Sequence, residues 1–137
     1  MEALGNMKRT HYCGSLRPKN VDQQTIVMGW VQKRRDLGGL IFVDLRDREG
    51  IVQIIFDKDI SEEAFAKAEK VRGEYVIAVK GIVKKRHAAN PNLPTGEIEV
   101  FAYEIKILSE AQTPPIYIDD EDDASEQLIL KYRYLDL

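Results

Sequence analysis

The sequence predicts an all-β fold, a five-stranded barrel with one helix between its third and fourth strands. Runs rich in β-branched residues, several with alternating apolar and polar side chains, recur five times between residues 25 and 108. Turn-forming residues separate these runs, and one segment with helical spacing follows the third. With 137 residues and 44% hydrophobic content, the chain can bury one ordinary core.

The first three predicted strands form a meander with short connections. Residues 25–35 are a β-branched run, and the turn at residues 36–39 follows, where two adjacent glycines allow positive φ. Residues 40–46 form the second strand. The Asp-Arg-Glu-Gly turn at residues 47–50 then reverses the chain into the third strand, residues 51–56.

A helix over about residues 61–72 is predicted next, covering one end of the sheet. Ser61 is the expected N-cap, and two glutamates in the first turn oppose the positive end of the helix dipole. Apolar residues recur at three-residue spacing, and Gly73 is the expected stop.

Two long strands complete the pattern, at residues 75–86 and 96–108, with Gly81 as a point where the first of them bends or bulges. The order of three strands, a helix and two strands is that of an OB-fold, a small Greek-key barrel known for oligonucleotide binding. An SH3-type barrel is the main alternative, but it would not place a full helix there. We therefore predict an OB-fold domain over residues 1–108.

The character of the chain changes after residue 108. Residues 109–127 contain a Pro-Pro break and a pure acidic run, and we expect them to form a linker. Residues 128–137 are apolar and aromatic again, which indicates the beginning of a second unit of a longer protein.

Composition excludes several classes of protein. No run is long enough to span a membrane, and the start lacks the apolar stretch of a secretory signal. Cys13 is the only cysteine, so no internal disulfide forms, which fits a reducing, cytosolic setting. His11 and His87 without a second cysteine make no metal-site spacing, and no metal site is expected.

The net charge of −3 conceals an uneven distribution. Residues 1–108 carry an excess of three positive charges, and residues 109–137 an excess of six negative ones. Basic residues cluster at Lys33-Arg34-Arg35, near Arg46 and Arg48, and again at Lys80 and Lys84-Lys85-Arg86. A solvated surface explains either cluster alone, but the two together favour a polyanionic partner.

One aromatic residue lies on the polar face of its strand. Burying Ile41, Val43 and Leu45 leaves Phe42 among charged neighbours, because successive strand side chains alternate. A ring among cations offers a single-stranded nucleic acid a platform for a base. Cover by a neighbouring strand or loop is the alternative for an isolated phenylalanine.

Polar residues on adjacent strands are candidates for base recognition. Gln53 is expected to face outward beside Phe42, where its amide offers a donor and an acceptor. On the last strand, Glu97 and Glu99 both face outward, and a carboxylate suits the adjacent N1–H and N2–H₂ donors of guanine. Asn90 and Asn92 lie in a loop that can close over the same groove, although turn formation explains them about as well.

Residues 29–53 closely resemble the anticodon-binding domain of bacterial aspartyl-tRNA synthetases, class II enzymes. Three further stretches match: His11-Tyr12-Cys13-Gly14, residues 95–100, and the Leu-Lys-Tyr-Arg-Tyr-Leu-Asp-Leu ending at residues 130–137. The resemblance extends over almost the whole chain from about residue 8.

The resemblance implies recognition of the GUC anticodon of a tRNA. It places Phe42 under the central uridine, which Gln53 recognises, and it assigns the first base, guanosine, to Glu99. Arg35 contacts the region of the central base, with Lys33 in the same basic cluster, and Arg86, Asn90 and Asn92 are placed near the third base. One departure concerns Ile55, at a position that can carry a second aromatic in this family.

The family's chemistry lies outside these residues. The full-length enzyme activates aspartate with ATP and Mg²⁺ and transfers it to the tRNA, and it is a cytoplasmic homodimer mainly through its catalytic domain. That domain would begin at about residue 128. No phosphate-cradling glycine-rich loop occurs in the chain, so we assign no catalytic residue and no cofactor to it.

Other interpretations stay open. The asparagine and lysine tRNA ligases recognise anticodons with the same central U, and the parent enzyme either charges aspartate tRNA alone or also asparagine tRNA. A generic OB module for single-stranded nucleic acid and a barrel that binds only proteins are alternatives of a different kind.

Overall fold

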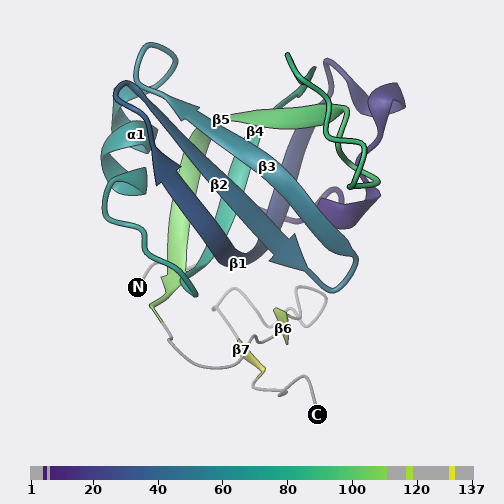
Figure 1. Ribbon diagram of the computed structural model, residues 1–137. Coiled ribbons are helices and arrows are strands. Elements are labelled where there is room, and N and C mark those ends of the chain that lie inside the picture. The colour runs from purple at the N-terminus through teal and green to yellow at the C-terminus, as the bar shows by residue number, and fades with distance from the viewer. Residues whose placement is uncertain (1–4, 6, 111–116, 119–129, 132–137) are drawn as a thin grey trace.

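Five strands form a closed barrel, with one helix between the third and fourth (Figure 1). The computed structural model describes residues 5, 7–110, 117–118 and 130–131. The barrel and its helix confirm the predicted OB-fold. Their bounds are β1 Gln24–Asp36, β2 Leu40–Asp47, β3 Gly50–Asp57, α1 Glu62–Ala68, β4 Val76–Lys85 and β5 Ile98–Ser109.

Short elements flank the barrel at both ends of the chain. Two 3-10 turns, η1 Cys13–Ser15 and η2 Pro18–Asn20, precede β1. Beyond the barrel, β6 Tyr117–Ile118 pairs antiparallel with β7 Leu130–Lys131. Of the predicted acidic linker at 109–127, the structure describes residues 109, 110, 117 and 118, and of the predicted second unit at 128–137 it describes residues 130 and 131. The other residues of both segments lie outside the described part of the chain.

Closure of the barrel depends on one parallel strand pair. The order around the barrel is β1-β2-β3-β5-β4, and every contact is antiparallel except that between β3 and β5. There Ile54 pairs with Val100, Ile55 with Phe101 and Phe56 with Ala102. Closing the sheet leaves no free strand edge among these five strands.

The barrel interior is filled by the inward half of each strand. Ile41, Val43 and Leu45 of β2 are fully buried, as the alternation predicted. Phe56 of β3 is the largest fully buried side chain. Helix α1 adds Ala64, Phe65 and Ala68 to the same core, so it covers one end of the barrel.

Helix α1 begins as predicted but ends earlier. The Ser61 hydroxyl accepts a hydrogen bond from the Ala64 N–H at 3.1 Å, which confirms the N-cap. The helix ends at Ala68, so the predicted end at residue 72 is wrong. The chain leaves the helix early because Val71 turns into the core, where it is fully buried, and Arg34 Nε donates to the Ala68 carbonyl at 3.3 Å.

A bulge in β1 decides which way its basic residues face. Val31 pairs with Leu45 and Lys33 with Asp44, so Gln32 is an extra residue. Before the bulge, Val27 and Val31 belong to the core. The added residue reverses this alternation, so that Lys33 and Arg35 lie on the outer face.

A second irregularity lies at Gly81, as the sequence predicted. Lys80 pairs with Glu104 and Gly81 with Ala102, so the extra residue is Tyr103 on the facing strand. A Cβ at Gly81 would lie 2.3 Å from the Phe101 carbonyl oxygen. Glycine is therefore needed there because the two backbones approach closely.

The N-terminal segment packs against the β2–β3 turn. The Asp47 carboxylate accepts hydrogen bonds from the Cys13 N–H at 2.6 Å and the Glu49 N–H at 2.9 Å. Cys13 is fully buried, and this burial raises the pKa of its thiol well above the usual value. Among the described residues, no helix has the length and apolarity needed to cross a membrane.

Replacing Gly81 with alanine is predicted to destabilise the barrel by about 1–3 kcal/mol, because the new methyl group meets backbone atoms that cannot rotate away. Urea unfolding of the variant and the parent chain measures this change. Gly39→Ala is the matched control, since no atom lies within 4 Å of the added carbon. It should alter stability by at most about 0.5 kcal/mol, and equal effects of the two changes would contradict the close approach at Gly81.

Candidate nucleic-acid interface

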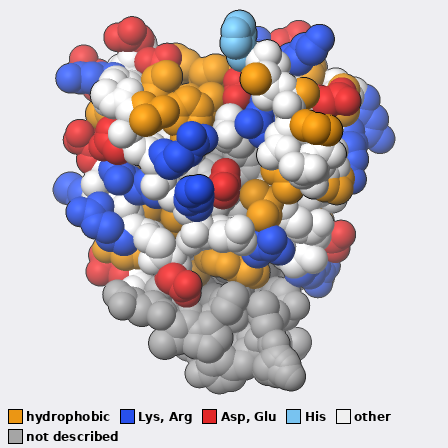
Figure 2. Space-filling view, viewed as in Figure 1, with side chains coloured by type: hydrophobic (Ala, Val, Ile, Leu, Met, Phe, Trp, Pro, Cys, Tyr) orange, Lys and Arg blue, Asp and Glu red, His pale blue; other side chains and the backbone are white. Residues whose placement is uncertain are grey.

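Two parallel rows of side chains cross the outer face of the barrel. The register aligns Arg35 of β1 with Phe42, Phe42 with Ile55, and Ile55 with Phe101 of β5. We call Phe42, Ile55 and Phe101 the apolar row, and Arg35 lies at its β1 end. Lysine and arginine side chains gather beside hydrophobic surface on the face that Figure 2 shows.

The second row is polar and lies two residues away along each strand. Lys33 pairs with Asp44, Asp44 pairs with Gln53, and Gln53 is hydrogen-bonded to Glu99. We call these four residues the polar row. The two rows place hydrogen-bonding groups beside a hydrophobic strip, which is the arrangement that unstacked bases require.

Phe42 lies on the outer face, as predicted from the alternation. Its ring is partly exposed, whereas its chain neighbours Ile41 and Val43 are fully buried. The guanidinium carbon of Arg35 lies 5.1 Å from the ring centroid, a cation–π contact. Arg35 and Phe42 therefore form one unit of a flat apolar surface and a positive charge.

Gln53 lies on the predicted face but is not open to solvent. Only 7% of it is exposed, so the expectation of a freely outward side chain is wrong. It lies opposite Asp44, and it is a diagonal rather than a direct neighbour of Phe42. Its amide Nε2 donates a hydrogen bond to Glu99 Oε1 at 2.9 Å. Barrel closure brings β5 against β3 and covers this glutamine.

Glu99, rather than Glu97, is the carboxylate that lies in the polar row. It is 7% exposed, whereas Glu97 is exposed and lies just before β5. Burial raises the pKa of the Glu99 carboxyl above its usual value of 4.5, and the hydrogen bond from Gln53 and the charges of Arg86 and His87 oppose the rise. The sequence alone did not indicate that His87 acts on Glu99, because a single histidine in a loop does not reveal which residues lie near it.

The loop between β4 and β5 is held by both backbone and side-chain hydrogen bonds. The Asn90 N–H donates to the Gly96 carbonyl at 2.8 Å, and Asn90 Oδ1 accepts from the Asn92 N–H at 3.0 Å. Thr95 Oγ1 donates to the carbonyl of Ile51, which fastens the loop to β3. Turn formation thus engages the Asn90 side chain, while Asn92 is exposed.

The two basic clusters divide into structural and available cations. Arg34 binds helix carbonyls, Lys84 Nζ pairs with Asp22 at 2.8 Å, and Arg48 packs on Tyr12 with 4.8 Å between guanidinium and ring centroid. Lys33 and Arg35, by contrast, are exposed along the two rows.

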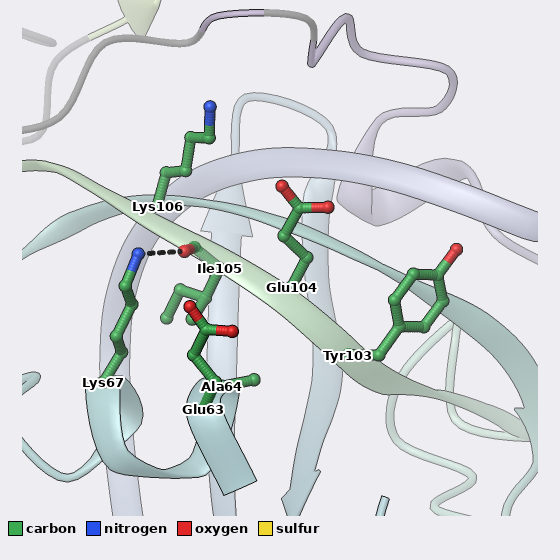
Figure 3. Close-up of a pocket in the computed structure, with 7 residues that line it drawn as sticks. All are labelled: Glu63, Ala64, Lys67, Tyr103, Glu104, Ile105 and Lys106. Carbon is green, nitrogen blue, oxygen red and sulfur yellow. Dashed lines mark hydrogen bonds between the residues drawn. The ribbon is translucent and has the colours of Figure 1, made fainter. Parts of the chain in front are cut away.

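A surface cavity of about 230 Å³ lies between α1 and β5 (Figure 3). It contains none of the residues predicted to bind an anticodon. Lys67 Nζ donates to the Ile105 carbonyl at 3.2 Å across it. The cavity is lined by Glu63, Ala64, Lys67, Tyr103, Glu104, Ile105 and Lys106.

Among the described residues, no cluster of three or more His, Cys, Asp or Glu could hold a metal ion.

Comparison with known proteins gives concordant results. The model of the family of OB-fold nucleic acid binding domains matches residues 25–108. An aspartate–tRNA ligase of Clostridium tetani is 59% identical over 136 residues, which cover 99% of this chain and 23% of the relative. An aspartate–tRNA(Asp/Asn) ligase of Caldanaerobacter subterraneus is 56% identical over 138 residues, with the same coverage. The chain thus spans about a quarter of the length of these relatives.

A solved structure extends the similarity to three dimensions. The asparaginyl-tRNA synthetase of Pyrococcus horikoshii, in complex with asparaginyl-adenylate, superposes with a TM-score of 0.65 at 31% identity. The matched region covers 77% of this chain and 23% of that one.

Replacing Glu99 with glutamine is predicted to stabilise the chain at neutral pH, because it removes a buried charge that the fold disfavours. The raised pKa means that the folded chain binds this proton more tightly than the unfolded chain does. The stability of the parent chain therefore rises relative to that of Glu99→Gln as pH falls from neutral towards about 4.5. Urea unfolding across that range measures the gap. A variant less stable at pH 7, by a margin independent of pH, would contradict the burial penalty.

Proposed function

This chain belongs to the family of OB-fold nucleic acid binding domains, and we propose that it recognises the anticodon of an aspartate tRNA as the N-terminal part of an aspartate–tRNA ligase. The geometry that supports the proposal best is the buried Gln53–Glu99 hydrogen bond beside the Arg35–Phe42 contact. It places an oriented amide next to a stacking surface.

The hydrogen bond explains how a glutamine can select uridine at the middle base. A carboxylate only accepts hydrogen bonds, so the Gln53 NH₂ group must face Glu99. This fixes the amide and leaves its oxygen and its second N–H for a base. Uridine offers the matching N3–H donor and a carbonyl acceptor. Cytidine offers the reverse pattern, an acceptor at N3 beside a donor amino group. To pair with it, the Gln53 amide would have to rotate by half a turn, which would place its oxygen against Glu99 Oε1.

Glu99 has capacity for a second interaction. Gln53 uses Oε1, and the carboxylate has another oxygen that can accept from guanine N1–H or N2–H₂. This agrees with the assignment of the first anticodon base to Glu99. The positive charge of Arg86 acts to lower the pKa of the Glu99 carboxyl, so Arg86 is a candidate for a neighbouring base. We assign the third base to Arg86 and Asn92, with Asn90 shaping the turn that carries Asn92.

The whole protein that we propose is a cytoplasmic ligase, homodimeric through its catalytic part. It would activate aspartate with ATP and Mg²⁺ and transfer it to tRNA. We assign these steps, and the groups that hold ATP and Mg²⁺, to the part of the ligase that this chain does not cover. The contribution of this chain is to bind the anticodon loop, with Lys33 and Arg35 neutralising phosphate charge.

Titration with anticodon stem-loops tests the proposed function. The chain should prefer GUC, or accept GUC and GUU, over UUU and an unrelated triplet, and its affinity should fall as the salt concentration rises. Fluorescence anisotropy at two salt concentrations measures both effects. Equal affinity for every triplet would indicate a generic nucleic-acid binder, and no binding at low salt would indicate a protein-interaction barrel. Either result would contradict the proposal.

Gln53→Ala is predicted to remove most of the preference for uridine over cytidine at the middle base, a loss of about 1–3 kcal/mol of discrimination. Affinities for GUC and GCC stem-loops measure the preference. Gln32→Ala is the matched control, because Gln32 is an exposed glutamine on the same barrel that binds Arg46 and lies outside both rows. A Gln53→Ala chain that keeps the full preference would show that another group recognises the base.

A further inference from the structure

Ile55 leaves the apolar row without an aromatic ring at the centre of β3. It pairs directly with Phe42 and is 5% exposed, so it serves as a floor rather than as a surface on which a base can stack. On its other side the parallel register pairs Ile55 with Phe101 of β5. A ring thus flanks the isoleucine on each side.

Phe101 presents its ring to the outer face of the barrel. Val100 and Ala102, its chain neighbours, are fully buried in the core, so alternation directs Phe101 outward. It is partly exposed, as Phe42 is. Strands lie about 4.8 Å apart, so the two phenylalanines, two strands apart, are separated by about 10 Å at the backbone. Each ring can therefore hold a base of its own.

The parallel pairing of β3 and β5 gives both strands the same order of residues on the outer face, a polar residue followed by an apolar one. Gln53 precedes Ile55 by two residues on β3, and Glu99 precedes Phe101 by two residues on β5. Because β3 and β5 run in the same direction, both polar groups lie on the same side of the apolar row. A base stacked on Phe42 directs its edge towards Gln53, and a base stacked on Phe101 directs its edge towards Glu99.

We propose that Phe101 is a second stacking platform, which holds the first anticodon base, a guanosine, while Glu99 recognises its edge. This inference rests on the proposed anticodon recognition and adds a subsite to it. In this chain β3 carries Ile55, which has no aromatic ring. The second ring comes instead from Phe101 on β5.

Phe101→Leu tests the platform, because leucine keeps the side chain apolar but removes the flat ring. The variant should bind the GUC stem-loop about ten-fold more weakly than the parent chain. It should bind a loop that is abasic at the first anticodon position as well as the parent chain does, since no base is there to stack. Phe101→Trp should retain the affinity for GUC, and urea unfolding of each variant separates lost binding from lost folding.

Two further variants make the result specific. Tyr103→Leu changes a partly exposed aromatic on the same strand that lines the α1 cavity instead, and it should bind GUC as the parent does. Phe42→Ala should weaken GUC binding and also weaken binding of the loop abasic at the first position, because it removes the platform for the middle base.

The outcomes distinguish this subsite from the proposed function itself. If Phe101→Leu binds GUC normally, or loses affinity equally for the abasic loop, while Phe42→Ala binds weakly, the Phe101 platform is overturned and anticodon recognition stands. If the parent chain shows no preference for GUC and Phe42→Ala changes nothing, the proposed function fails and the subsite fails with it.

Discussion

The parallel pairing of β3 with β5 is the constraint on which the candidate interface depends. Only three residue pairs form the ladder between these strands, from Ile54 with Val100 to Phe56 with Ala102. They close the barrel and bring together side chains that are 46 residues apart in the chain, Gln53 and Glu99. The same register continues the apolar row from Phe42 through Ile55 to Phe101. Without this closure, the outer face would carry an exposed glutamine and an unpaired carboxylate instead of an oriented pair.

Much of the fold could be predicted because its signals are local. Alternation of side chains placed Ile41, Val43 and Leu45 inside and Phe42 outside, and turn residues separated the strands. The N-cap at Ser61 followed from its side-chain oxygen alone. The end of α1 could not be predicted, since it depends on Arg34 reaching from β1 to the helix carbonyls and on Val71 packing into a core built by distant strands.

Less of the candidate interface could be predicted from the sequence, because its geometry depends on contacts between residues distant in the chain. A single extra residue, Gln32, reverses the direction of Lys33 and Arg35, and no local pattern marks it. Gln53 follows the predicted alternation, but its burial and its hydrogen bond to Glu99 depend on β5, a strand distant in the sequence. The structure distinguishes Glu99 from Glu97 by its burial and by one hydrogen bond, neither of which the sequence expresses. The role of Lys84 in an ion pair with Asp22 is likewise a product of tertiary structure.

In the proposed function, an amide held by a carboxylate selects a base on the outer face of the barrel. The side-chain NH₂ resonances of Gln53 in a ¹⁵N-labelled chain, followed by NMR during titration with a GUC stem-loop, test it most directly. These resonances should shift on binding, together with backbone amides of β3 and β5, while the Gln32 side-chain resonances should change little. Tight binding of the loop with Gln53 unperturbed, and with shifts centred on the cavity between α1 and β5, would contradict it.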